Sequence, residues 1–165
     1  MNDAYEELIA GQRVLRRSLT SLHETLVARL HQLVAQSLPR NSSLRLLAPR
    51  SELELDGHSI FRPDLAIVKM EPRTSENQRV QLYLVAEVLQ SGDHHVDTVD
   101  KKQVWTDGRL PRLWMIDPRY LNVEVYGCNE TGFGLRQILA NHHALTDPHL
   151  PGFNYSMSEL FAGSL

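Results

Sequence analysis

Two short apolar runs, each carrying one carboxylate, constrain this chain more than any other stretch of its sequence. Residues 64–68 form the first run, with Asp64 directly after Pro63, and residues 82–89 form the second, with Glu87 inside it. Both have the length of a strand, and the second is apolar on both faces apart from Glu87, which indicates a central strand. A carboxylate in a buried strand is costly unless it is paired, hydrogen-bonded or bound to a metal. Asp64 and Glu87 are therefore predicted to share a divalent-metal site. The alternatives are that Asp64 caps a turn and that Glu87 pairs with a core cation.

Length and composition narrow the class of protein. The 165 residues predict one domain, 1–165, that is long enough to bury a sizeable core. The net charge of −3 gives no overall basic field, so any nucleic-acid binding must rest on a local patch. The single Cys128 excludes an internal disulfide framework and indicates a reducing compartment. The chain shows no apolar signal core and no apolar run of membrane-spanning length, so it is predicted to be cytoplasmic, with no membrane partner.

The first forty residues predict a hairpin followed by a long helix. Residues 5–9 and 12–15 flank Gly11 as a short hairpin, with a helix as the alternative. Ser21 and Glu24 have the spacing of a capping box, which predicts the start of the helix. His23 and His31 are interpreted as surface or capping histidines rather than ligands. An apolar stripe at helical spacing supports the helix: Leu19, Leu22, Leu26, Leu30 and Leu33.

The remaining patterns alternate between strands and short helices. Asp97, Lys101 and Trp105 recur at i, i+4 and i+8 and predict one face of a helix that follows the second acidic strand. Ser156 is predicted to cap a short terminal helix. The resulting fold class is α+β (mixed α/β), with a central mixed sheet flanked by helices. The other predicted segments are strands at residues 44–48, 52–55, 80–89, 113–117, 121–126 and 135–139, a hydrophilic loop at 70–79 and a turn at 150–153.

The predicted helix supplies a candidate cation for the acidic pair. Trp105 is apolar and should turn its face of the helix toward the core, which carries Lys101 inward with it. Lys102 lies about 100° further around the helix and should face solvent. The alternative is that Lys101 is only a solvated partner of Asp97, which contributes about 0.2–0.5 kcal/mol. The two readings differ in whether Lys101 is buried.

The order of these motifs resembles the restriction-endonuclease-like superfamily, written PD-(D/E)XK, and within it the Uma-two family. The resemblance spans most of the chain and implies a restriction-endonuclease-like core with an N-terminal hairpin. The motifs that carry it are Glu7-Leu8-Ile9-Ala10-Gly11, Ser21 with His23 one residue short of the usual spacing, Pro63-Asp64, Glu87-Val88-Leu89-Gln90-Ser91, Asp97 with Lys101 and Trp105, and Leu113-Trp114-Met115-Ile116-Asp117-Pro118.

Two positions depart from the superfamily pattern. The lysine that normally follows the strand glutamate by two residues is replaced by Leu89. In the family that the chain resembles, the lysine lies instead in the following helix, where this chain has Lys101. Trp105 also replaces the usual tyrosine, a change that is compatible with packing. Lys101 is therefore the candidate for the missing cation.

These residues predict a chemistry for phosphodiester hydrolysis. Asp64 and Glu87 would hold Mg²⁺ (or Mn²⁺) through oxygen ligands, with the Val88 backbone carbonyl as a third protein ligand. The metal would lower the pKa of its bound water, and Lys101 would orient the water or stabilise the pentavalent species. Glu7 is a candidate accessory carboxylate, although hairpin solubility also explains it. Asp97, four residues before Lys101, is the other accessory candidate.

Two functional classes remain open. The first is a Mg²⁺-dependent nuclease that hydrolyses DNA, with Asp64, Glu87 and Lys101 as catalytic residues. The second is a catalytically inactive restriction-endonuclease-like domain that binds nucleic acid or a protein partner. The joint presence of the three residues favours the first class, whereas Leu89 and the negative net charge favour the second. By analogy with the family it resembles, the chain is expected to be a homodimer.

Overall fold

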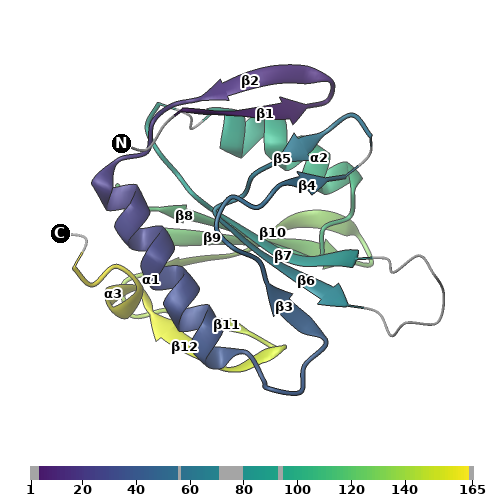
Figure 1. Cartoon of the computed structure of the whole chain (residues 1–165). Coiled ribbons are helices and arrows are strands. Elements are labelled where there is room, and N and C mark those ends of the chain that lie inside the picture. The colour runs from purple at the N-terminus through teal and green to yellow at the C-terminus, as the bar shows by residue number, and fades with distance from the viewer. Residues whose placement is uncertain (1–3, 56, 71–79, 93–94, 164–165) are drawn as a thin grey trace.

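A six-stranded mixed sheet forms the centre of the molecule in the computed structural model, which describes residues 4–55, 57–70, 80–92 and 95–163 (Figure 1). The chain has the predicted α+β architecture, with a second, four-stranded sheet and a two-stranded ribbon. In chain order the elements are β1 (Tyr5–Ile9), β2 (Gln12–Arg16), α1 (Ser21–Ser37), β3 (Leu44–Leu46), β4 (Leu53–Glu54), β5 (Ile60–Phe61), β6 (Leu65–Met70), β7 (Val80–Val88), the π-helix η1 (Val96–Lys101), α2 (Lys102–Asp107), β8 (Arg112–Asp117), β9 (Asn122–Asn129), β10 (Gly132–Ala140), β11 (Ala144–Asp147), β12 (Leu150–Ser156) and α3 (Met157–Leu160).

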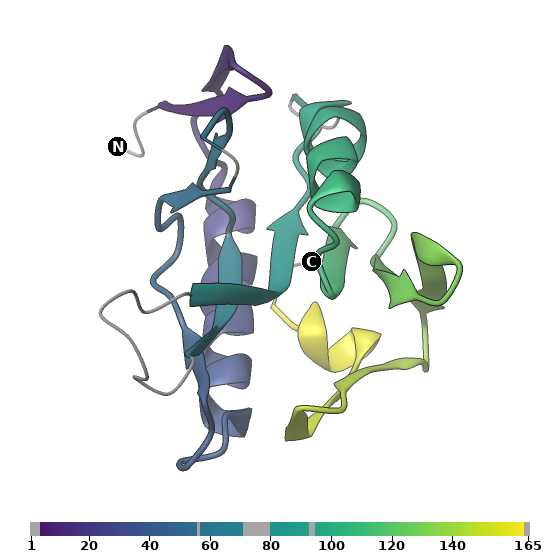
Figure 2. The ribbon, with the colours of Figure 1, turned by 90° about the vertical axis from the view of Figure 1, so that its right-hand side faces the viewer.

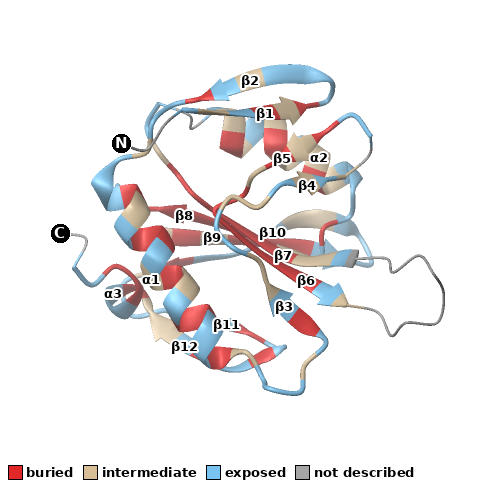
Figure 3. Ribbon diagram, viewed as in Figure 1, coloured by how far each residue is buried: buried red, intermediate tan, exposed pale blue. Residues whose placement is uncertain are grey.

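The central sheet has the strand order β10-β9-β8-β7-β6-β3, and the small sheet has the order β2-β1-β5-β4. Strands β7 and β8 run parallel, whereas the other neighbours in the central sheet are antiparallel. Strands β6, which follows Asp64, and β7, which contains Glu87, are interior neighbours. Most of β6, β7 and β8 is buried, as the red segments of Figure 3 show. This burial confirms the inference that a run apolar on both faces is a central strand.

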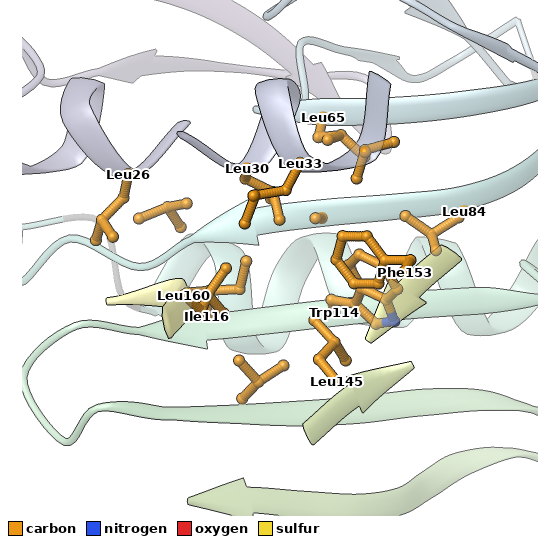
Figure 4. Packing of buried hydrophobic residues seen from close by; sticks show 14 of the residues in the cluster. Leu26, Leu30, Leu33, Leu65, Leu84, Trp114, Ile116, Leu145, Phe153 and Leu160 are labelled. Atoms are coloured by element: carbon orange, nitrogen blue, oxygen red, sulfur yellow. The ribbon is translucent and has the colours of Figure 1, made fainter. Parts of the chain in front are cut away.

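One face of the central sheet is covered by α1, α3 and the β11–β12 ribbon. Helix α1 directs Leu26, Leu30 and Leu33 onto strand residues that include Leu65 and Leu84 (Figure 4). Full burial of each leucine stabilises the fold by about 1.5–3 kcal/mol. The apolar stripe is shorter than predicted, because Leu22 in the first turn is 39% exposed. The helix therefore packs mainly through its central and last turns.

The other face is covered by η1, α2 and the small sheet. Trp105 packs edge-on against Phe61 with ring centroids 4.7 Å apart, within a second apolar cluster that also contains Leu89. Figures 1 and 2 both show the β1–β2 hairpin and the η1–α2 helix at the same end of the molecule. Two segments distant in sequence therefore meet over one end of the central sheet. None of the described helices is long and apolar enough to cross a membrane.

The hairpin prediction is confirmed, and its alternative as a helix is wrong. Strands β1 and β2 pair in register from Tyr5 opposite Arg16 to Ile9 opposite Gln12. Ala10 and Gly11 form the turn with φ of 48° and 80°, the positive values that a tight hairpin turn of this twist requires. The predicted loop at 70–79 lies almost wholly outside the described residues.

Two local predictions are wrong. Thr20, not Ser21, caps α1, because its side chain accepts a hydrogen bond from the His23 backbone N–H at 3.2 Å. The segment predicted as a turn at 150–153 belongs to strand β12, which pairs with β11. Pro151 is tolerated there because the β11–β12 register shifts between Leu150 and Asn154, so Pro151 has no ladder partner and its missing N–H costs no ladder hydrogen bond.

Candidate active site

The strand register brings Asp64 and Glu87 together. Leu65 pairs with Ala86 in the antiparallel β6–β7 ladder, so the preceding Asp64 comes opposite Glu87. Residues opposite one another in such a ladder project from the same face. Asp64 Oδ2 accepts a hydrogen bond from the Val88 N–H at 2.9 Å, which fixes the carboxylate beside Glu87 and Val88. Asp64 and Glu87 are each only 3% exposed.

Lys101 is completely buried against this pair. Its Nζ contacts Glu87 Oε1, lies 3.0 Å from Glu7 Oε1 and lies 3.7 Å from Asp97 Oδ1. The reading of Lys101 as a solvated partner of Asp97 is therefore wrong. Leu89, which stands at the superfamily's lysine position, packs in the apolar cluster around Trp105 instead. The ammonium group thus reaches the strand carboxylate from the helix side.

Lys101 and Asp97 both come from η1, a single π-helical stretch ahead of α2. Such stretches are rare and often occur at functional sites. Both residues and Trp105 are buried, so the prediction of a shared inward face is confirmed. The prediction that Lys102 faces solvent is only partly correct, because its Nζ lies over the Tyr126 ring, 4.7 Å from the centroid.

The N-terminal hairpin contributes two buried charges to the cluster. Glu7 Oε1 accepts a hydrogen bond from the Arg62 N–H at 2.7 Å, and Glu7 Oε2 lies 2.5 Å from Arg16 Nη1. Arg16 Nη2 also lies 2.8 Å from Asp97 Oδ1. Glu7 is 2% exposed, so hairpin solubility does not explain it. Sequence reasoning missed Arg16, although the hairpin register opposite Tyr5 places it on the same face as Glu7.

His23 is a second residue that sequence reasoning missed. Its Nε2 lies 3.0 Å from Asp64 Oδ2, and the residue is 4% exposed, so its reading as a surface or capping histidine is wrong. The nearby His31 Nε2 lies 2.8 Å from the Asp64 backbone carbonyl oxygen. The residue that caps helix α1 provides a sequence signal for the role of His23. Thr20, unlike Ser21, stands three residues before His23, which is the spacing of the family pattern.

Burial and the neighbouring charges shift the pKa values of the cluster. Burial raises the pKa of Glu87 to about 8 against the opposing effect of Lys101, and Asp97 raises it further. Burial also raises the pKa of Asp97 despite the nearby Lys101 and Arg16. For Glu7, burial acts upward, but the two cations outweigh it and lower the pKa. Burial alone would lower the pKa of Lys101, but the carboxylates raise it overall, so Lys101 stays charged.

The cluster offers carboxylate oxygens, the kind of ligand that a hard divalent cation binds. Its four buried carboxylates are Glu7, Asp64, Glu87 and Asp97, and they face Lys101, Arg16 and Arg50, whose Nη1 lies 3.8 Å from Asp64 Oδ1. Asp64 Oδ1 is buried and has no hydrogen-bond partner among the described residues. Within those residues, no group of three or more His, Cys, Asp or Glu is placed to hold a metal. Two carboxylates are nevertheless enough for Mg²⁺, which keeps several waters and binds substrate phosphates.

Comparisons with known proteins agree with this architecture. The model of the Uma2 family, described as "Putative restriction endonuclease", matches residues 2–158. A crystal structure of a putative nuclease belonging to DUF820 from Anabaena variabilis superposes with a TM-score of 0.77 at 16% sequence identity. The match covers 97% of this chain and 91% of that one, so the two share a restriction-endonuclease-like fold. The comparison with curated proteins gives no match.

Proposed function

Because the chain belongs to the Uma2 family of putative restriction endonucleases, we propose that it is a Mg²⁺-dependent nuclease that hydrolyses phosphodiester bonds in DNA. The observation that carries the proposal is the meeting of Asp64, Glu87 and Lys101 in one buried cluster of acidic side chains. Ionised carboxylates are costly in a protein interior unless a cation compensates them, and burial raises the pKa of Glu87 and Asp97 despite the nearby Lys101. A divalent ion would supply that compensation.

The residues of the cluster have distinct proposed roles. Asp64 and Glu87 hold the metal, with the Val88 carbonyl as a further ligand, and the bound metal supplies an activated water and charge compensation. Lys101 stabilises the charge that develops on the phosphorus oxygens. Glu7 and Asp97 hold Lys101 in place. His23 orients the Asp64 carboxylate from the side of α1.

The burial of the cluster favours a second candidate function. A phosphate can reach carboxylates that are 3% exposed only if a covering element moves, and the β1–β2 hairpin provides part of the cover through Glu7 and Arg16. In addition, the Lys101 ammonium already contacts Glu87. A catalytically inactive domain that binds nucleic acid or a protein partner would keep this closed arrangement.

Calorimetric titration with Mn²⁺ separates the two functions. The wild type should bind Mn²⁺, and Asp64→Ala should lose that binding. Asp107→Ala, which removes an exposed carboxylate on α2, is the matched control and should bind like the wild type. Absence of Mn²⁺ binding by the wild type would reject the metal-dependent nuclease and leave the binding module.

A cleavage screen then identifies the substrate. Single-stranded, duplex and branched DNA should be incubated with the wild type, Asp64→Ala and Asp107→Ala in Mg²⁺. The proposal expects at least one form to be cut by the wild type and the control but not by Asp64→Ala. The same proposal includes a homodimer, which would present two sites to a duplex. Cleavage that survives in Asp64→Ala would show that this cluster is not the site of hydrolysis.

A further inference from the structure

An open cavity of about 860 Å³ lies at the other end of strands β7 and β8 from the carboxylate cluster. The start of β7, the segment that joins α2 to β8, the β9–β10 hairpin and the β11–β12 turn all line it. Tyr83 in the lining precedes Glu87 by four residues, or about 13 Å along a strand. The volume of the cavity lies within the range of about 300–1,000 Å³ that is typical of small-molecule sites.

The lining of this cavity is basic, although the chain as a whole is not. Arg109, Arg112, Arg136 and His149 line it, whereas Glu130 is the one carboxylate among its lining residues. The net charge of the whole chain is −3, so this concentration of arginines departs from the overall balance. A concave surface of one sign attracts a ligand of the opposite sign.

Backbone irregularities place three of these side chains. The β6–β7 register shifts so that Tyr83 has no partner on β6, and the β9–β10 register shifts in the same way at Arg136. Bulges of this kind redirect a side chain and are frequent beside binding sites. Arg109 has a φ of 52°, a left-handed conformation that favours glycine. An arginine at this position is therefore strained.

A buried carboxylate holds much of the lining in a fixed arrangement. Asp147, which is 4% exposed, accepts a hydrogen bond from the Tyr83 hydroxyl at 2.7 Å and pairs with Arg112 Nε at 3.1 Å. Arg136 donates to the carbonyl oxygens of Gly127 and Gly132. The Arg109 guanidinium, by contrast, has no hydrogen bond or ion pair among the described residues. The lining therefore contains two guanidinium groups that are held in place, those of Arg112 and Arg136, and one that is not, that of Arg109.

We propose that this cavity binds a nucleotide, with its phosphate held by Arg109 and Arg112 and its base beside Phe133 and His149. Guanidinium groups match phosphate oxygens in geometry, and aromatic rings accept a base of any identity. Phe133 is half-buried and stacked on Tyr126, which makes it a rigid platform. The nucleotide can be free or part of a nucleic-acid strand. The inference does not depend on the carboxylate cluster.

Fluorescence anisotropy with a labelled 12-nucleotide single-stranded DNA, in EDTA, tests the site without any metal. Arg109→Gly removes the unengaged cation and relieves the left-handed strain, so its melting temperature should not fall below the wild-type value. Its affinity should fall about tenfold or more, as expected for a lost charge-assisted hydrogen bond. The slope of log affinity against log salt should decrease by about 0.7. Arg40→Ala, an exposed arginine elsewhere, is the control and should retain wild-type affinity.

Competition by dAMP distinguishes the two sources of the nucleotide. Displacement of the labelled strand by dAMP at similar phosphate concentration would assign the cavity to free nucleotides, and failure to displace it would assign the cavity to strands. The proposal is overturned if the wild type binds neither probe, or if Arg109→Gly and Arg40→Ala weaken binding equally. Because EDTA is present, loss of the proposed nuclease activity would not affect this result.

Discussion

At the scale of single residues, the lysine of the candidate site comes from η1, whereas the superfamily pattern places it on the strand. The strand position that carries lysine in the superfamily holds Leu89, which is buried in the apolar cluster. Lys101 on η1 contacts Glu87 from the helix side. A buried ammonium surrounded by Glu7, Glu87 and Asp97 contributes to folding as well as to any chemistry.

Replacement of Lys101 should therefore destabilise the protein strongly. Lys101→Met leaves three buried carboxylates without their shared cation and should lower the free energy of unfolding by about 3–5 kcal/mol. Lys102→Met, in the neighbouring position over Tyr126, should cost only about 0.5–1 kcal/mol. Urea unfolding of both variants at neutral pH measures the difference. Similar losses in the two variants would contradict the central place of Lys101.

The raised pKa of Glu87 predicts a pH dependence of stability. Its pKa rises from 4.5 to about 8 on folding, chiefly through burial, so between these values the folded state binds more protons than the unfolded state. Glu87 therefore contributes a stability that falls as pH rises from about 4.5 to 8 and is constant above that range. In urea unfolding with EDTA, the free energy of unfolding of Glu87→Gln should rise relative to that of the wild type as the pH rises through this interval. If the difference in free energy of unfolding between the two proteins does not change with pH, the raised pKa of Glu87 is excluded.

At the scale of elements, the β1–β2 hairpin is part of the candidate site rather than an appendage. Its Glu7 holds Lys101, and its Arg16 bridges Glu7 to Asp97 on η1. The hairpin and the π-helical stretch are joined through these charges over the end of the central sheet (Figure 2). Loss of one bridging charge should loosen both elements.

Two arginines on the same hairpin allow a matched test. Arg16→Ala removes a buried cation between two carboxylates and should lower the free energy of unfolding by about 3–5 kcal/mol. Arg13 lies 3.7 Å from Glu6 with both side chains exposed, so Arg13→Ala should cost less than about 1 kcal/mol. Chemical denaturation of both variants provides the measurement. An equal effect would show that the hairpin docks without its charge network.

At the scale of the whole molecule, the central sheet ends in an open edge. Strand β10 is its outermost strand, and it exposes Leu135 (46%) and Ile138 (54%). An edge strand with exposed apolar side chains is a template for pairing with another chain. This surface is the natural place for the proposed homodimer.

Light scattering at micromolar concentration should give twice the chain mass of 18.8 kDa. Ile138→Lys introduces a charge on the open edge and should shift the protein to a monomer. Leu15→Lys changes an exposed leucine on β2, which belongs to the other sheet, and should remain dimeric. A wild-type mass of one chain would reject the dimer, and a dimeric Ile138→Lys would place its interface elsewhere.

Features that depend on residues close together in the chain could be predicted from the sequence. Strand periodicity located β6 and β7 with their acids, and the turn chemistry at Gly11 located the first hairpin. Local patterns failed where a tertiary partner decided the outcome, as for β12, which begins at the predicted turn and pairs with β11 through Leu150 and Asn154 to Ser156. The family resemblance indicated Lys101, whereas spacing alone left open whether it was buried.

Which charges face one another depends on how distant elements pack together. Lys101 and Glu7 are 94 residues apart in sequence, and Arg16 and Asp97 are 81 residues apart. Their contacts follow from the docking of a hairpin against a helix. The periodic pattern of residues within either segment does not predict that docking. His23 is a similar case, because its burial against Asp64 depends on how α1 crosses the start of β6. Periodicity specifies the face on which a side chain lies, and packing between distant elements specifies what it meets there.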